Sequence, residues 1–214
     1  KDGKVLSACE EERFTGIKHD SSFPTNSIKW MLKEKNLTGD DISVVCFYES
    51  PSDKLDRIKK TSKRTFIQKL NFFDNSVEKN RKQYKEVERQ IYKHTNKDIR
   101  LVYGNHHLSH AAYGFYTSKF QDSAIVTVDG VGEWETTAIY FGNRHKIINL
   151  ESINFPHSLG MLYSTFTAYL GFKPNEGEYK IMGLAPYGNP NIYEKEFKKL
   201  YKVDEKGLFK LNMK

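Results

Sequence analysis

The chain has 214 residues, of which 38% are hydrophobic and 14% aromatic, so it can bury a sizeable core. Its net charge of +7 comes from one segment: residues 54–100 hold 15 Lys and Arg against 6 Asp and Glu, while the remainder holds 19 against 21. No apolar run approaches the about 20 residues of a membrane span, and two cysteines, Cys9 and Cys46, make no disulfide framework, so we exclude membrane and disulfide-rich classes and expect a cytoplasmic location.

Strands and helices are predicted to alternate in the first half of the chain. Residues 3–14 favour one or two strands joined through a Gly turn, and 23–37 favour a helix with three-to-four spacing of apolar residues. The apolar run at 40–50 predicts a buried strand. A long amphipathic helix, or a helical pair broken near Asn80, is predicted by apolar residues that step by threes and fours: Phe66, Leu70, Phe73, Val77, Tyr84, Val87 and Ile91.

A strand at 99–107 is predicted to run into a cluster of histidines, followed by a helix at 109–118. A further strand at 122–130 ends in Asp-Gly. Residues 136–153 predict a hairpin with its turn at Gly142 and Asn143.

The carboxyl-terminal part begins with a predicted buried helix at 158–172, closed by Gly171. Gly and Pro punctuate 175–190, which we therefore expect to be mostly loop. A polar helix and a strand-like tail are expected at 192–214. The order of elements indicates an α/β chain with a second lobe beginning near Asp122.

Three of the seven histidines fall within five positions. His106 and His110 are four residues apart and would share one helix face, close enough to ligate one ion. His107 and His110, three apart, are the competing pair. The alternative is a helix amino terminus with hydrogen-bonded histidines and no ion.

Asp129 ends the next predicted strand, and ligands often bind where strands of an open α/β sheet end. Two His and one Asp would leave positions open on the ion, which suits iron or manganese in a catalytic site better than a closed structural zinc. Alternatively, Asp129 is an ordinary turn residue before Gly130. Gly130 and Gly132 would allow backbone amides to approach an anion, as in nucleotide-binding hairpins.

Two further stretches carry candidate residues. The charged segment 10–20 either forms a solvated edge or projects Lys18 and His19 into a cleft, where they would bind a phosphate or polarise a carbonyl. A Gly-flanked stretch further on carries Glu176 and Lys180, either in a structured loop or at a functional site.

The basic segment 54–100 could bind nucleic acid through Lys59, Lys60, Lys63 and Arg64. No aromatic-basic recognition motif accompanies these residues, and we favour a solvated helical face.

Five motifs occur in order along the chain: EERFTGIKHDSSFP, HHLSHAA, VTVDGVGEWETT, FPHSLGMLYSTFTAYLGF and EGEYKIMGLAPYG. Together they resemble the O-carbamoyltransferase family of nodulation-factor, cephamycin and aminoglycoside carbamoylating enzymes. The resemblance covers essentially the whole chain apart from the basic segment and the tail. More distantly, the chain resembles the metalloproteins that transfer threonylcarbamoyl to tRNA.

The resemblance implies a fold of the actin, Hsp70 and sugar-kinase type, with two ribonuclease-H-like lobes around a nucleotide cleft. The first lobe would span 1–121, with a basic helical insertion at about 53–97, and a truncated second lobe would span 122–214. The family's first strand would precede Lys1. The rest of the second lobe and a carbamoyladenylate-forming domain would follow Lys214, so we expect a chain that is incomplete at both ends.

The resemblance also implies that His106, His110 and Asp129 hold Fe(2+), or another divalent ion, in contact with nucleotide phosphates. A further ligand is implied beyond Lys214. His107 falls between the two ligands and faces elsewhere, and is then either a structural residue or one that contacts a ligand without binding the ion.

Lys18 is implied to contact the carbamoyl-donor intermediate, with His19 beside it. Glu176, Gly177 and Lys180 are implied to lie near the nucleotide or the acceptor.

Two positions leave open points in the resemblance. Gly16 stands where a basic residue is expected, which weakens the expectation of a phosphate contact there, and His157 matches a family position with no assigned role.

The implied function of the full-length enzyme is transfer of a carbamoyl group from carbamoyl phosphate, through carbamoyladenylate made with ATP and Mg(2+), to a hydroxyl of a small-molecule acceptor. We expect the 214 residues alone to be inactive. The alternatives are a relative of the tRNA threonylcarbamoyl transferases, or a nucleic-acid- or partner-binding module that uses the basic helix.

Overall fold

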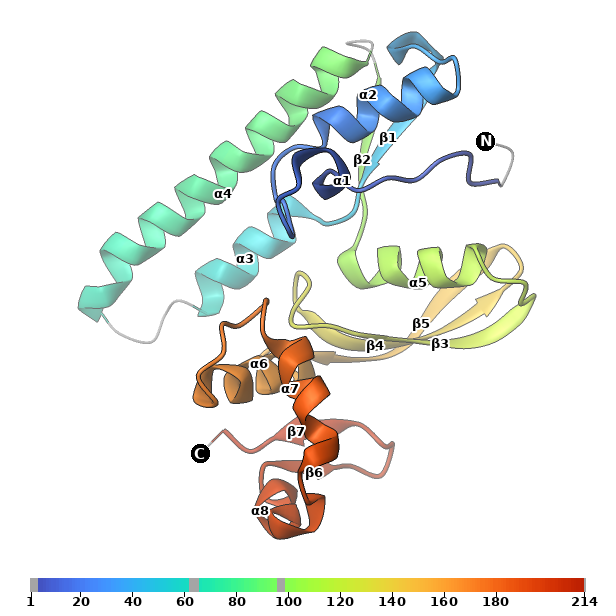
Figure 1. The fold of residues 1–214 in the computed structure, drawn as a ribbon. Coiled ribbons are helices and arrows are strands. Elements are labelled where there is room, and N and C mark those ends of the chain that lie inside the picture. Colours follow the sequence, from blue (N-terminus) through green and yellow to red (C-terminus); the bar gives the residue numbers. More distant parts are fainter. Residues whose placement is uncertain (1–3, 62–65, 96–98, 214) are drawn as a thin grey trace. The chain divides into compact units, whose positions relative to one another are not determined.

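A computed structural model describes residues 4–61, 66–95 and 99–213. The chain divides into two units, Lys1–Gly104 and Asn105–Lys214, which we describe separately. Figure 1 shows the elements of each unit along the chain. Within the described residues, none of the helices has both the length and the apolar character needed to cross a membrane.

A two-stranded parallel sheet lies at the centre of the first unit. Strand β1 (Val44–Phe47) pairs with β2 (Arg100–Tyr103), and helices α3 (Pro51–Thr61) and α4 (Phe66–His94) connect them. The expected strand at 40–50 is confirmed in its centre, but it is not buried, because its residues alternate between exposed and half-buried. It begins late because a capped 3₁₀ turn, η1 (Gly39–Asp41), precedes it.

Helix α4 is one continuous helix of 29 residues, with no break at Asn80. Tyr84 and Ile91, two turns apart, are buried as the predicted amphipathic face requires. The side chains of Phe66, Leu70, Phe73 and Val77 lie outside the described residues. The Tyr84 hydroxyl donates a 2.7 Å hydrogen bond to the buried carboxylate of Glu49, which follows β1, and so joins the helix to the sheet.

Several cations of the basic segment pair with carboxylates one helical turn away: Lys60 with Asp56, Lys82 with Glu78, and Arg89 with Glu86. Such exposed pairs are typical of a solvated helix surface. Lys63 and Arg64 lie outside the described residues. The pairs support the interpretation as a solvated face, and nucleic-acid binding by this segment stays an untested alternative.

The predicted strands at 3–14 are wrong. Residues 4–10 form no strand, and a short helix, α1 (Glu12–Thr15), follows and ends at Gly16 with φ +69°. The reason is Glu11, whose buried carboxylate accepts hydrogen bonds from the main-chain and side-chain groups of Asn26 and Ser27, at 2.7–3.1 Å. Glu11 thereby caps helix α2 (Thr25–Glu34), and the chain turns instead of extending.

The second unit contains a three-stranded antiparallel sheet with β4 in the middle. Its strands are β3 (Asp122–Val128), β4 (Glu135–Asn143) and β5 (Lys146–Asn154). The hairpin prediction is confirmed, but the turn lies at Arg144 and His145, two residues later than expected. Gly142 stays in the strand because its backbone lies against the Phe115 ring, where an added Cβ would come within 2.7 Å.

Helix α5 (His106–Tyr116) covers one face of this sheet. Ala111 of the helix packs with Ala138 and Tyr140 of β4, and Ile125 and Ile147 complete this core. Because α5 packs on the sheet, the second unit begins before residue 122. The chain has a mixed α/β structure, and the division into two ribonuclease-H-like lobes stays a prediction.

The rest of the second unit is a series of short elements. They are α6 (Leu159–Tyr169), α7 (Glu178–Leu184), the 3₁₀ turns η2 (Ala185–Tyr187) and η3 (Pro190–Ile192), α8 (Glu194–Lys198), and a hairpin of β6 (Tyr201–Val203) and β7 (Phe209–Leu211). The helix and strand-like tail expected at 192–214 are confirmed.

The loop expected at 175–190 is wrong, because α7 occupies its centre. The Glu178 carboxylate accepts hydrogen bonds from the Ser164 hydroxyl and the Asn175 main chain, at 2.7 and 2.8 Å, which fixes the start of α7 against α6. Gly and Pro therefore flank a helix in this segment and do not prevent one from forming.

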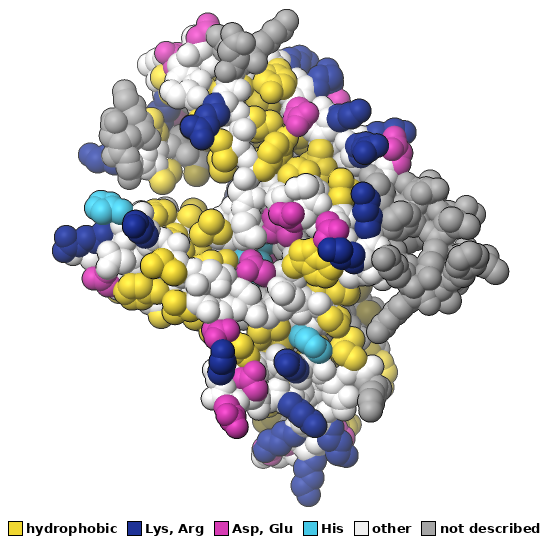
Figure 2. Space-filling model, turned by 180° about the vertical axis from the view of Figure 1, so that it is seen from behind, with side chains coloured by type: hydrophobic (Ala, Val, Ile, Leu, Met, Phe, Trp, Pro, Cys, Tyr) yellow, Lys and Arg dark blue, Asp and Glu magenta, His cyan; other side chains and the backbone are white. Residues whose placement is uncertain are grey.

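Helix α6 exists as predicted, but it is not buried within the described chain. Thr167 is its buried residue, whereas Met161 and Tyr163 are 41% exposed and Tyr169 is 83% exposed. Figure 2 shows hydrophobic side chains reaching the surface among charged ones. An apolar stretch of sequence predicts a helix, but it does not identify which part of the protein, if any, packs against that helix.

Candidate metal centre

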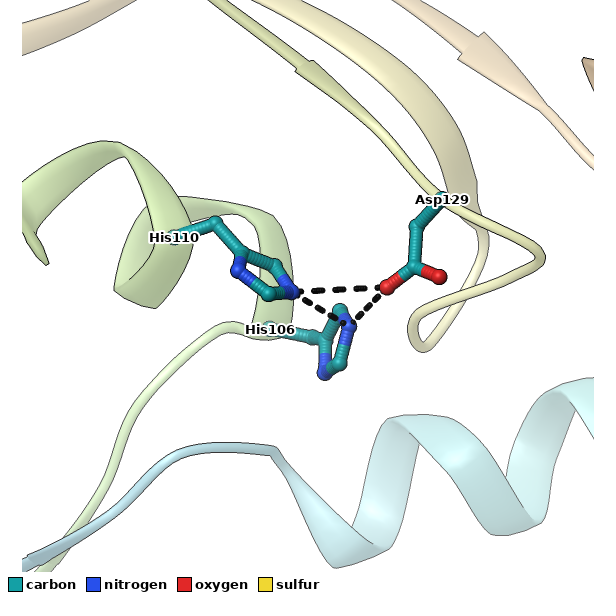
Figure 3. Close-up of side chains that lie close together, drawn as sticks. All are labelled: His106, His110 and Asp129. Carbon is teal, nitrogen blue, oxygen red and sulfur yellow. Dashed lines mark hydrogen bonds and ion pairs between the residues drawn. The ribbon is translucent and has the colours of Figure 1, made fainter. Parts of the chain in front are cut away.

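Three side chains that the sequence singled out come together in the second unit (Figure 3). The Nε2 atom of His106 lies 2.5 Å from Oδ2 of Asp129 and 3.2 Å from Nε2 of His110. The Nε2 atom of His110 lies 3.4 Å from the same Asp129 oxygen. These potential ligand atoms all lie within 4.8 Å of one another. The predicted pair of histidines and the predicted Asp therefore form one cluster.

The start of α5 places the two histidines. Asn105 caps the helix by accepting a 2.9 Å hydrogen bond from the Leu108 N–H, so the first helical residue is His106. His110 follows one turn later on the same face, and the two ring centroids are 4.7 Å apart. Both oxygens of Glu133, which is only 3% exposed, lie 3.1 Å from the His106 main-chain nitrogen. A buried carboxylate thus holds the ligand-bearing end of the helix.

Asp129 directly follows β3. Its N–H donates to the Thr136 carbonyl of β4 at 2.9 Å. The N–H of Gly130 donates to Oδ1 of Asp129 at 2.6 Å, which leaves Oδ2 to face the histidines. The hydrogen bond from His106, together with that from Gly130, holds the pKa of the Asp129 carboxyl well below its usual range. The carboxylate therefore stays ionised at neutral pH, as a metal ligand must.

His107 is fully buried and faces away from the cluster. Its Nε2 lies 2.9 Å from the Glu135 carbonyl oxygen and its Nδ1 lies 2.7 Å from the Thr127 hydroxyl. A carbonyl only accepts, so Nε2 carries the proton and Nδ1 accepts from Thr127. Burial lowers the pKa of His107, which keeps the ring neutral. Both nitrogens have protein partners, in agreement with the interpretation of His107 as structural.

The donor set fits a divalent ion. An ion about 2.1 Å from each ligand places neighbouring ligand atoms about 3 Å apart in octahedral geometry. The observed separations of 2.5, 3.2 and 3.4 Å bracket this value, so only the contact between His106 and Asp129 must open slightly. Two imidazoles and one carboxylate are also a donor set that iron(II) uses with further positions open.

Gly132 has a packing role in this structure, whereas a Cβ added to Gly130 would meet no atom within 4 Å. A Cβ on Gly132 would lie 3.0 Å from side-chain atoms of both His106 and His107. Its N–H donates to the Glu135 carbonyl at 2.8 Å, and that of Gly130 donates to Asp129. Anion contact by these amides stays a prediction.

Lys18 and His19 belong to the Lys1–Gly104 unit, whereas the cluster belongs to the other. Both side chains are exposed, in the turn after α1. His19 has φ +56°, and its N–H donates to a Glu12 carboxylate oxygen at 2.9 Å. The turn is therefore built by hydrogen bonding, and its role with a ligand stays a prediction.

Glu176, Gly177 and Lys180 lie at the start of α7. Glu176 pairs with Lys173 at 2.5 Å, and Gly177 lies so close to Lys173 that an added Cβ would come within 2.9 Å of its carbonyl oxygen. The ammonium of Lys180 lies 6.0 Å from the centroid of the Tyr179 ring. Their proposed contact with nucleotide or acceptor is not tested by this arrangement.

Two residues that support the site, Glu133 and Ser158, were not predicted from the sequence as site residues. Glu133 and Ser158 contact the backbone of His106 and of the Asp129–Gly130 segment, respectively. The Nδ1 atom of His157, which had no assigned role, accepts from the Leu211 N–H at 3.2 Å. A Ser before an apolar run signals a helix cap, but no local pattern predicts what else that side chain contacts.

A family model described as the carbamoyltransferase N-terminus matches residues 1–214. An uncharacterized protein of Synechocystis is 39% identical over 221 residues, which cover 100% of this chain and 36% of that protein. The nodulation protein NolNO of Sinorhizobium fredii is 29% identical over 214 residues, 99% of this chain and 30% of the relative. The chain thus spans about a third of these relatives.

Proposed function

This chain belongs to the carbamoyltransferase family, whose amino-terminal region it spans, and we propose that the protein containing it carbamoylates a hydroxyl of a small-molecule acceptor. The proposed donor is carbamoyladenylate, made from carbamoyl phosphate and ATP with Mg(2+). The family match and the five ordered motifs support the proposal. We also propose the actin, Hsp70 and sugar-kinase type of fold, with which the mixed α/β structure agrees.

The observation that carries the site proposal is the convergence of His106, His110 and Asp129. We propose that they hold a divalent ion, iron first, through two Nε2 atoms and one carboxylate oxygen. Such an ion would act as a Lewis acid and neutralise phosphate charge. Asp129 brings a negative charge into the site, and its low pKa keeps that charge at neutral pH.

The proposed reaction forms a bond from the acceptor oxygen to the carbamoyl carbon and breaks the bond from that carbon to the phosphate oxygen, so that AMP leaves while the acceptor hydroxyl gives its proton to a base. The leaving phosphate carries negative charge, so a cation near it lowers the barrier. We propose that Lys18 supplies that charge, with His19 beside it, and that Glu176, Gly177 and Lys180 lie near the nucleotide or the acceptor. The exposure of Lys18 and His19 is compatible with ligand contact.

The test is metal and nucleotide binding by the anaerobically purified chain. We expect the wild type to take up one equivalent of a divalent metal, with His106→Ala and His110→Ala reducing uptake strongly. His145→Ala, on the exposed hairpin turn, is the matched control and should bind like the wild type. A wild-type chain without metal, whose ATP binding does not respond to added iron, would contradict the metal centre.

The reaction itself is tested in the complete protein. Radiolabel from carbamoyl phosphate should enter hydroxylated acceptors only with ATP, and AMP should form in step. Transfer of label without ATP would contradict the proposed carbamoyladenylate route.

A further inference from the structure

The segment that joins β5 to α6 contacts the loop that carries Asp129. It contains the Phe155–Pro156 peptide bond, His157 and Ser158, and Gly160 follows as the second residue of α6. Ser158 is fully buried and is the amino-terminal cap of α6, where its hydroxyl oxygen accepts from the Met161 N–H at 3.0 Å. A capping serine needs no burial, so its surroundings call for a second explanation.

The Ser158 hydroxyl also contacts the backbone of the metal-site loop. Its Oγ lies 2.6 Å from the Gly130 carbonyl oxygen and 3.3 Å from that of Asp129. A hydroxyl has one proton, so Ser158 donates mainly to the nearer Gly130 carbonyl while it accepts from Met161. One side chain thereby ties the start of α6 to the carbonyl of Gly130, the residue after Asp129.

The position of Gly160 shows that the start of α6 lies very close to the backbone of Asp129 and Gly130. A Cβ on Gly160 would lie 2.7 Å from the Asp129 carbonyl oxygen and 2.8 Å from both the Asp129 carbonyl carbon and the Gly130 nitrogen. These are backbone atoms, which cannot turn aside as a side chain can. Any other residue at position 160 must therefore push α6 and the loop of Asp129 apart.

Thr136 of β4 holds the loop and the joining segment together. Its carbonyl accepts the Asp129 N–H at 2.9 Å, and its buried hydroxyl lies 2.5 Å from the His157 carbonyl oxygen and 3.0 Å from that of Ile153. The Asp129 main chain is thus held through its N–H by β4 and on its carbonyl side by the start of α6. This leaves little freedom for the carboxylate that faces His106.

We propose that Ser158 and Gly160 are positioning residues that fix Asp129 for metal binding. The inference rests on the proposed function for the metal, but the positioning itself can be measured without one. Residues that orient a metal ligand commonly change affinity by about 10- to 100-fold when they are replaced. We expect Ser158→Ala to weaken divalent metal binding by about 10-fold and Gly160→Ala to weaken it further.

The test uses the 214-residue chain and two readouts. The first is the set of His106 ring resonances in the metal-free protein, which report its contact with Asp129. The second is titration with Fe(2+) under anaerobic conditions, or with Co(2+) followed by its absorption. Thr165→Ala removes an exposed α6 hydroxyl, and Gly183→Ala adds a Cβ where nothing lies within 4 Å; both controls should match the wild type.

The outcomes separate the two proposals. Shifted His106 resonances in Ser158→Ala and Gly160→Ala, with weaker metal binding, support positioning. If the wild-type chain binds no metal but the His106 resonances still shift in the two variants, the positioning role is supported and the metal proposal is contradicted. Unshifted resonances with wild-type affinity in Ser158→Ala would overturn the inference, and Ser158→Ala alone decides if Gly160→Ala does not fold.

Discussion

The carboxylate of Asp129 meets the imidazole of His106 at 2.5 Å, although 23 positions separate the two residues in the sequence. One follows a strand and the other begins a helix that covers the same sheet. The contact therefore depends on how α5 starts and on where β3 ends. The predictions below test the contacts that fix those ends and the units around them.

Removal of the Glu133 carboxylate should loosen the start of α5. Both Glu133 oxygens lie 3.1 Å from the His106 nitrogen, and the side chain is buried. We expect Glu133→Ala to reduce the free energy of unfolding by about 1–2 kcal/mol, as loss of a helix cap does, and to weaken metal binding. Urea unfolding measures the first effect. Glu194→Ala, in the exposed first turn of α8, is the control, and equal stability of both variants would contradict the assigned role.

His107 should be needed for stability and not for metal binding. His107→Phe keeps a ring but leaves the Thr127 hydroxyl and the Glu135 carbonyl without their bonds to the imidazole. We expect a loss of about 1–3 kcal/mol in the free energy of unfolding, since two buried hydrogen bonds are lost and each contributes about 0.5–1.5 kcal/mol. Metal uptake per folded chain should stay at the wild-type level. A stable His107→Phe chain that had lost its metal would make His107 a ligand.

Glu11 should give the first unit a pH-dependent stability. Burial raises the pKa of this carboxyl, but hydrogen bonds from Ser27 and Asn26 outweigh it, and the pKa is lowered. A lowered folded-state pKa means that the stabilisation is complete above the unfolded-state pKa of about 4.3 and is lost as the pH falls through the folded value. Urea unfolding of wild type and Glu11→Gln should therefore differ most near pH 7 and converge in acid. A constant difference across this range would contradict the assignment.

Gly142 should tolerate no side chain while Phe115 is present. A Cβ there would come within 2.7–2.9 Å of three ring atoms. We expect Gly142→Ala to reduce the free energy of unfolding by about 1–3 kcal/mol through overpacking, and Phe115→Leu in the same chain to recover part of it. Gly114→Ala, on α5 with nothing within 4 Å, is the control and should not destabilise. Additive effects of the two replacements would show that the ring and the glycine do not interact.

Local periodicity predicted the elements that carry the candidate site. Helical spacing placed His106 and His110 one turn apart, and the apolar run before Asp129 predicted the strand that ends there. These predictions succeeded because a repeat of 3.6 residues or of two depends only on neighbours in the chain. The same reasoning failed at residues 3–14. There the conformation depends on hydrogen bonds from Glu11 to Asn26 and Ser27, which lie 15 and 16 positions away in the sequence.

The sequence by itself determined the family, the spacing of the two histidines and the candidate third ligand. Tertiary structure decided that Oδ2 of Asp129 faces them, that His107 turns into the core, and that α6 is fixed to the Asp129 loop. These contacts join residues 23 to 29 positions apart. Such pairs are selected by packing and by the need to satisfy buried polar groups, and no local pattern records which partners will meet.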